Sequence, residues 1–115
     1  MEQDAALDFC TNRPAAELKH PFGFETAVFT VRGKVFAIVP LDSDQASITL
    51  KCSPPDAEEL VREHDAVTPG YHMNKRHWIT VELDGSLPEG LEADLIDESY
   101  RLVIATLPKA QRPVA

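Results

Sequence analysis

The chain has 115 residues, with 19 acidic and 11 basic side chains and a formal net charge of −8. A chain of this length buries roughly two-thirds of its unfolded surface, enough for one core but not for separate nucleotide-binding and substrate domains. No apolar run reaches the ~20 residues of a membrane span, and the acidic start MEQDAALDFC is unlike a basic secretory signal. We therefore expect one cytoplasmic domain over residues 1–115, with residues 108–115 as a loosely ordered tail.

The first half of the chain predicts one helix followed by antiparallel strands. Apolar residues recur at helical spacing over residues 2–12, until an arginine-proline pair ends the pattern. β-Branched and aromatic side chains fill residues 25–31 and 34–39, and the turn-like Arg32-Gly33 between them predicts a hairpin. Residues 46–51 alternate apolar and polar side chains, which is typical of a strand with one buried face.

The second half predicts helix, strand and helix. Ser53 precedes two prolines and an apolar stripe at helical spacing, so we expect its side chain to cap a helix. Residues 77–83 alternate as a strand, and the S-x-x-E pattern from Ser86 to Glu89 predicts the start of a third helix that runs to Leu107. The order α-β-β-β-α-β-α favours a single α+β domain, with a mainly antiparallel sheet and helices packed on one side.

Several segments of the chain form a recognisable set. They are His20-Pro21-Phe22-Gly23, Lys34-Val35-Phe36-Ala37, the ten residues from Pro69 to Trp78, and the runs 83–88 and 96–100. Together they resemble the MmcQ/YjbR family of small bacterial proteins over nearly the whole chain. The resemblance implies a fold similar to the frataxin-like and secretion-chaperone-like folds, with two β-hairpin wings, and it implies DNA binding. It implies no catalytic residues.

The segment from residue 66 to residue 81 is locally basic. It holds two cations, two histidines and no acid in an otherwise acidic chain. In a nucleic-acid site, cationic side chains bind phosphates, polar side chains form hydrogen bonds, and aromatic rings stack against bases. The candidate nucleic-acid residues are Tyr71, His72, Asn74, Lys75, Arg76, His77 and Trp78, joined by Arg32 and Lys34 at the predicted hairpin tip. Contact with ~3 phosphates predicts weak, salt-sensitive binding with a log–log salt slope of about −3.

A structural interpretation of the same segment stays open. Pro69-Gly70 would then turn the chain, Trp78 would pack in the core, and the polar side chains would bond to backbone groups of the loop. His72 and His77 are five residues apart, unlike the i, i+4 histidines of helical zinc sites, and neither cysteine has a zinc-type spacing. We therefore expect buried thiols, no disulfide framework and no metal.

Enzyme motifs are missing from the sequence. The serines lie in capping and helical contexts, and the five glycines form no phosphate loop. We expect a non-enzymatic binding module without a cofactor, which binds DNA weakly. The alternative is a protein- or peptide-binding module that presents an apolar groove on its sheet or helix faces. In both cases we expect a monomer that does not bind membranes.

Overall fold

The computed structural model describes residues 1–70 and 74–113, which form six strands, three α-helices and one short 3-10 helix. The elements in chain order are α1 (Gln3–Thr11), β1 (Ala16–Lys19), β2 (Thr26–Val31), β3 (Lys34–Pro40), β4 (Ser47–Lys51), α2 (Pro54–Glu63), β5 (Val67–Pro69), β6 (Trp78–Glu82), α3 (Leu91–Ile104) and η1 (Lys109–Gln111). Among the described residues, no helix is long and apolar enough to cross a membrane.

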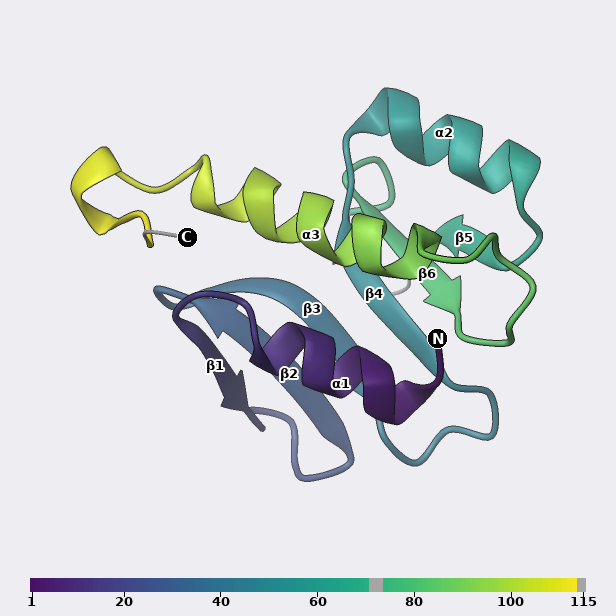
Figure 1. Ribbon diagram of the computed structural model, residues 1–115, viewed down its shortest axis with the longest axis horizontal. Helices are drawn as coiled ribbons and strands as arrows, with labels where there is room; N and C mark the ends of the chain where they lie inside the picture. Colours follow the sequence, from purple (N-terminus) through teal and green to yellow (C-terminus); the bar gives the residue numbers. More distant parts are fainter. Residues whose placement is uncertain (71–73, 114–115) are drawn as a thin grey trace.

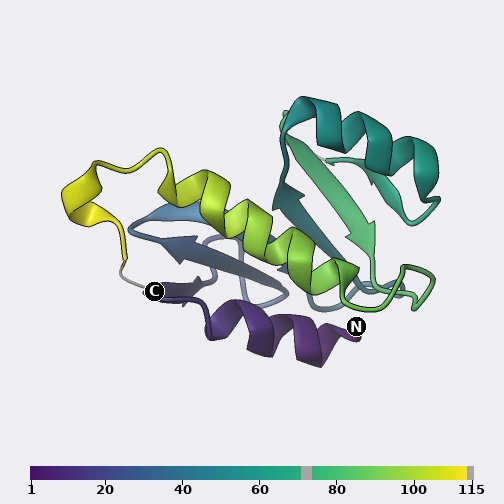
Figure 2. The same ribbon diagram turned by 45° about the horizontal axis from the view of Figure 1, so that its top comes forward.

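The strands form one antiparallel sheet in the order β1-β2-β3-β4-β6-β5, covered by helices on one face (Figure 1). α1 and α3 cross this face, and Figure 2 shows α3 running along the middle of the sheet. α2 packs against β5 and borders the same small hollow as α3. The other face of the sheet, which we call the open face, carries none of the described helices. The predicted α+β architecture and helix-strand order are confirmed.

Two short strands were not predicted from the sequence. β1 pairs with β2 at one edge of the sheet, and β5 pairs with β6 at the other. Three of the four residues of β1 are exposed, and β5 has only three residues. Short exposed edge strands need no alternation of apolar and polar residues, so hydrophobic periodicity does not reveal them.

Two predicted helix caps were wrong. α3 begins at Leu91, whereas the backbone N–H of Ser86 donates to Asp84 Oδ1 at 2.9 Å in the preceding turn. The hydrogen bonds from Ser86 also lower the pKa of Asp84. Ser53 does occupy the N-cap position of α2, but its side chain makes no capping hydrogen bond. Pro55 at the second helical position has no N–H for that hydroxyl to accept.

The core lies between the helices and the covered face of the sheet. Phe36 is fully buried, and its ring meets the ring of Tyr100 edge-on at 5.4 Å. The largest fully buried side chains are Phe29, Phe36, Ile48, Leu50, Ile79 and Ile96. Because these residues come from strands on both halves of the sheet and from α3, one continuous core holds the two halves together.

A buried serine closes a gap where two central strands separate. β3 and β4 pair as far as Ala37 and Leu50 and then diverge towards the hairpin end (Figure 1). The next two backbone groups, the carbonyl of Phe36 and the N–H of Lys51, bond to Ser99 instead. Ser99 Oγ accepts from the Lys51 N–H at 2.8 Å and donates to the Phe36 carbonyl at 2.6 Å. This single hydroxyl therefore joins α3 to both diverging strands.

We expect Ser99→Ala to lower the free energy of unfolding by about 2–4 kcal/mol, because it leaves a buried carbonyl and a backbone N–H without partners. Urea denaturation followed by circular dichroism measures this change. Ser43→Ala, at an exposed position, is the control and should change the free energy by less than about 0.5 kcal/mol. Equal stabilities of the two variants would contradict the bridging role of Ser99.

The two cysteines are free and buried, so their thiols should react slowly. Burial raises the pKa of Cys10 to about 12, and burial together with the charges of Asp56 and Glu98 raises the pKa of Cys52 to about 11. At pH 8 we expect labelling by a disulfide reagent to be at least about 100-fold slower in the native protein than in denaturant. Similar rates in both states would contradict this expectation.

Candidate nucleic-acid interface

Residues 74–77 form a hydrogen-bonded turn that leads into β6. Asn74 Oδ1 accepts from the Arg76 N–H at 3.0 Å, and the Asn74 carbonyl accepts from the His77 N–H at 3.0 Å. The carbonyl of His77 in turn accepts from the Cys52 N–H at 2.8 Å. The side-chain carbonyl of Asn74 thus shapes the turn, which ties the start of β6 to the end of β4.

Lys75 and Arg76 project from this turn and are exposed. They border a hollow of about 260 Å³ between the turn and the start of α2, together with Glu58 and several apolar side chains. Neither cation is within ion-pair distance of a carboxylate among the described residues. The carboxylate of Glu58 nevertheless lowers the positive potential of this hollow. Tyr71 and His72, also predicted as contact residues, lie outside the described residues.

Trp78 is half-buried and is not a fully buried core residue. It pairs with Lys51 on β4, and its carbonyl accepts from the Gly70 N–H at 2.8 Å. A Cβ atom at Gly70 would lie 2.6 Å from the Cβ of Trp78, closer than real Cβ contacts allow. Gly70 is therefore required because the two backbones approach each other closely.

We expect Gly70→Ala to push the start of β6 away and to lower the free energy of unfolding by about 1–3 kcal/mol. Trp78 is the sole tryptophan of the chain, so its fluorescence reports the displacement directly. Thr68 lies on β5 just before Gly70 and is exposed, so Thr68→Ala serves as the control. An alanine variant with unchanged melting temperature and emission would show that the contact relaxes without cost.

Arg32 and Lys34 lie at the tip of the β2–β3 hairpin and are exposed. Arg32 and Gly33 both have left-handed backbone angles, with φ of +51° and +81°, as a two-residue hairpin turn requires. Arg32 Nε donates to the Gln111 carbonyl at 3.0 Å, and Lys34 Nζ donates to Thr106 Oγ1 at 3.1 Å. The C-terminal segment is therefore attached along the hairpin tip.

This attachment creates a basic surface that the sequence analysis missed. Arg112 donates to the carbonyls of Leu107 and Ala105 at 3.0 and 3.1 Å, and Lys109 begins η1. We call the four exposed cations Arg32, Lys34, Lys109 and Arg112 the hairpin cluster. The stretches 26–41 and 99–113 contain no acidic residue. The absence of acidic residues from the C-terminal stretch was the one sequence feature that could have indicated this basic surface. Only the fold places that stretch against a hairpin that is distant in the sequence.

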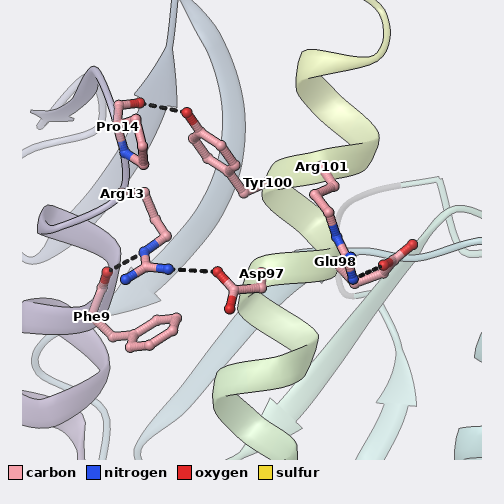
Figure 3. A network of polar contacts seen from close by, with 7 residues as sticks. All are labelled: Phe9, Arg13, Pro14, Asp97, Glu98, Tyr100 and Arg101. Atoms are coloured by element: carbon pink, nitrogen blue, oxygen red, sulfur yellow. Dashed lines mark hydrogen bonds and ion pairs between the residues drawn. The ribbon is translucent and has the colours of Figure 1, made fainter. Parts of the chain in front are cut away.

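Two further cations near α3, Arg13 and Arg101, form ion pairs within the protein. Figure 3 shows Arg13 donating to Asp97 at 2.6 Å and Arg101 donating to Glu98 at 2.5 Å. Tyr100 donates to a carbonyl after α1, and burial raises its pKa. The Arg13 and Tyr100 contacts fasten the chain after α1 to α3, and the Arg101–Glu98 pair lies within α3. The hairpin cluster instead bonds to carbonyls and a hydroxyl and keeps its net positive charge.

The candidate residues thus form two groups. β2 ends, β3 begins, β4 ends and β6 begins at the same end of the sheet, because adjacent strands run antiparallel. The two halves of the sheet diverge there (Figure 1), so the hairpin cluster and the 74–77 turn lie on separate halves. In the described part of the chain, no group of three histidine, cysteine or acidic side chains is placed to hold a metal ion.

The open face carries an apolar hollow of about 560 Å³. We call it the open-face hollow, and its lining contains no charged side chain. The lining residues are Pro21, Phe22, Thr26, Val28, Val35, Ile38, Pro40, Ser47, Thr49 and Thr80. The loop 20–25 forms one side, and His20 Nδ1 lies 3.0 Å from the Thr26 carbonyl at the base of that loop. This hollow was not located by the sequence analysis.

Comparison with known proteins agrees with this architecture. The YjbR family model matches residues 11–102. The chain belongs to the YjbR family. It is 37% identical to YjbR of Escherichia coli K12 over 106 residues, covering 92% of this chain and 90% of that protein. It is also 38% identical to YbdF of Escherichia coli O157:H7 over 96 residues, covering 84% of this chain and 79% of that protein.

Solved structures of related proteins share the fold. The crystal structure of DR2400 from Deinococcus radiodurans has a TM-score of 0.89 at 36% identity, covering 95% of this chain and 83% of that one. A crystal structure from Pseudomonas syringae has a TM-score of 0.76 at 28% identity, covering 89% of this chain and 98% of that one. The family predicted from the sequence is therefore confirmed, and the ligand must be argued from the surface.

Proposed function

We propose that the chain is a non-enzymatic module that binds the phosphate backbone of DNA. The hairpin cluster is the main contact, and Lys75 and Arg76 form a second one. The observation that carries the proposal is the exposed hairpin cluster, which combines four cations from two acid-free stretches of a chain with net charge −8.

The overall negative charge does not prevent such contacts, because salt limits the range of surface charges. The Debye length is ~8 Å at physiological ionic strength, so a phosphate at the hairpin tip responds mainly to nearby charges. Within the described residues the four cations make no ion pair. The acidic remainder of the surface repels DNA and so favours the orientation in which the hairpin cluster faces the duplex.

The small number of cations makes this binding weak and independent of sequence. Contacts to phosphates position a protein on DNA and carry no base information by themselves. If the hairpin cluster neutralises ~4 phosphates, the slope of log affinity against log salt is about −4. Binding is therefore strongest at low salt and decreases steeply towards physiological salt.

The open-face hollow favours a second candidate function, protein binding. Its uncharged lining suits apolar side chains and offers nothing to a phosphate. The two functions use different surfaces of the protein.

Fluorescence anisotropy of labelled double- and single-stranded oligonucleotides tests DNA binding at several salt concentrations from about 20 mM upwards. We expect Lys34→Glu/Lys109→Glu to weaken binding at least about 10-fold at low salt and to reduce the salt slope by about 2. Lys75→Glu/Arg76→Glu should have a smaller effect, because Glu58 already lowers the potential there. Circular dichroism checks that each variant is folded.

Lys19→Glu/Arg62→Glu is the matched control, since it changes the net charge equally at exposed positions that belong to neither group. Retained binding in this control with loss in the hairpin variant supports the proposal. Equal loss in all three variants would show that only net charge matters. Absence of binding by the unmodified chain at the lowest salt would overturn the proposal.

A further inference from the structure

We propose that two copies of this chain associate through their open faces, with the loop 20–25 of each copy entering the open-face hollow of the other. The open faces take no part in the proposed DNA binding. The open-face hollow is thereby assigned a partner, and the dimer differs from the monomer expected from the sequence.

The hollow is suited to apolar side chains from a partner. Val28, on its floor, is 2% exposed, and no lining side chain is charged. The hydroxyls of Thr49 and Thr80 lie 2.9 Å apart and bond to each other across the floor. An apolar group that enters the hollow therefore displaces water without burying a charged side chain. It also leaves the hydrogen bond between those two hydroxyls intact.

The same chain supplies the side chains that fit it. Phe22 and Phe24 on the loop 20–25 are 74% and 85% exposed, the highest values among the large hydrophobic side chains described. Exposed aromatic side chains beside an apolar depression are the usual anchors of protein interfaces. Because each copy carries one loop and one hollow, a two-fold axis satisfies both at once.

Charge complementarity selects the direction of that axis. The hairpin end of the sheet carries Lys34 and Lys51, whereas the opposite end carries Glu25, Asp42 and Glu82. A two-fold axis that lies between the sheets and perpendicular to the strands reverses one copy relative to the other. Each basic end then faces an acidic end, whereas an axis parallel to the strands would oppose like charges.

The size of the face predicts a weak dimer that depends on the loops. Strands ~4.8 Å apart and ~17 Å long give a projected sheet area of roughly 400 Å² per copy, below the ~800 Å² per partner of a standard interface. The phenylalanines of the two loops must supply much of the remaining contact. We therefore expect association in the range of roughly ten to several hundred micromolar.

Sedimentation velocity without nucleic acid, from about 5 to 500 µM protein at physiological ionic strength, tests the proposal. We expect the unmodified chain to shift from monomer to dimer and Phe22→Ser/Phe24→Ser to remain monomeric throughout. These positions are exposed, so the variant should fold normally. Leu18→Ser removes a half-exposed hydrophobic side chain outside the hollow and should still dimerise.

A mixing experiment tests reciprocity. Ile38→Thr changes the hollow while keeping a β-branched residue in the strand, and it leaves the loop intact. Phe24→Ser changes the loop and leaves every residue that lines the hollow in place. We expect Phe24→Ser and Ile38→Thr each to dimerise poorly alone, and a mixture of these two variants to recover part of the association. In the mixed dimer one intact loop still meets one intact hollow.

The proposal is overturned if the unmodified chain stays monomeric up to 500 µM, or if the double phenylalanine variant dimerises normally. Equal loss in the Leu18 variant would also overturn it, because the contact would then be non-specific. A monomeric chain whose hollow binds an added apolar peptide would assign the hollow to a peptide. None of these outcomes depends on DNA binding, so the two proposals fail or succeed separately.

Discussion

The structure depends on the hydroxyl of Ser99, which joins two strands that no longer pair with each other. β3 and β4 separate beyond Ala37 and Leu50, and backbone groups left unpaired at that depth would cost free energy. Ser99 satisfies one group on each strand from α3. The helix therefore fills the gap between the two halves of the sheet, and the sheet can open without losing a continuous core.

The divergence of β3 and β4 determines where the positive charges at the hairpin end of the sheet lie. The β2–β3 hairpin extends on one half, and the 74–77 turn lies on the other half. The C-terminal segment follows α3 back to the hairpin and is held there by Arg32 and Lys34. A basic surface thus arises from two segments far apart in the chain, whereas the turn near Lys75 stays beside the carboxylate of Glu58. This contrast is why the two groups are expected to contribute unequally to phosphate binding.

The two faces of the sheet have different roles. The covered face holds Phe36 and the other large core residues under the helices. The open face carries threonines, valines and one isoleucine around an uncharged hollow, beside an aromatic loop that is exposed to solvent. The strand alternation in the sequence predicts that one face is buried, but it does not show that the opposite face is hollow. Concavity results from the twist of the sheet and the placement of the loop 20–25.

The sequence by itself determined the family, the α+β class, the four longer strands and the three helices, because these follow from local periodicity and short motifs. Only the tertiary structure decided that Trp78 is half-buried, that α3 starts at Leu91 and that Lys109 and Arg112 join the hairpin. The edge strands, the role of Ser99 and the open-face hollow likewise appear only after folding. Each depends on residues distant in the chain, whose contacts local patterns do not encode.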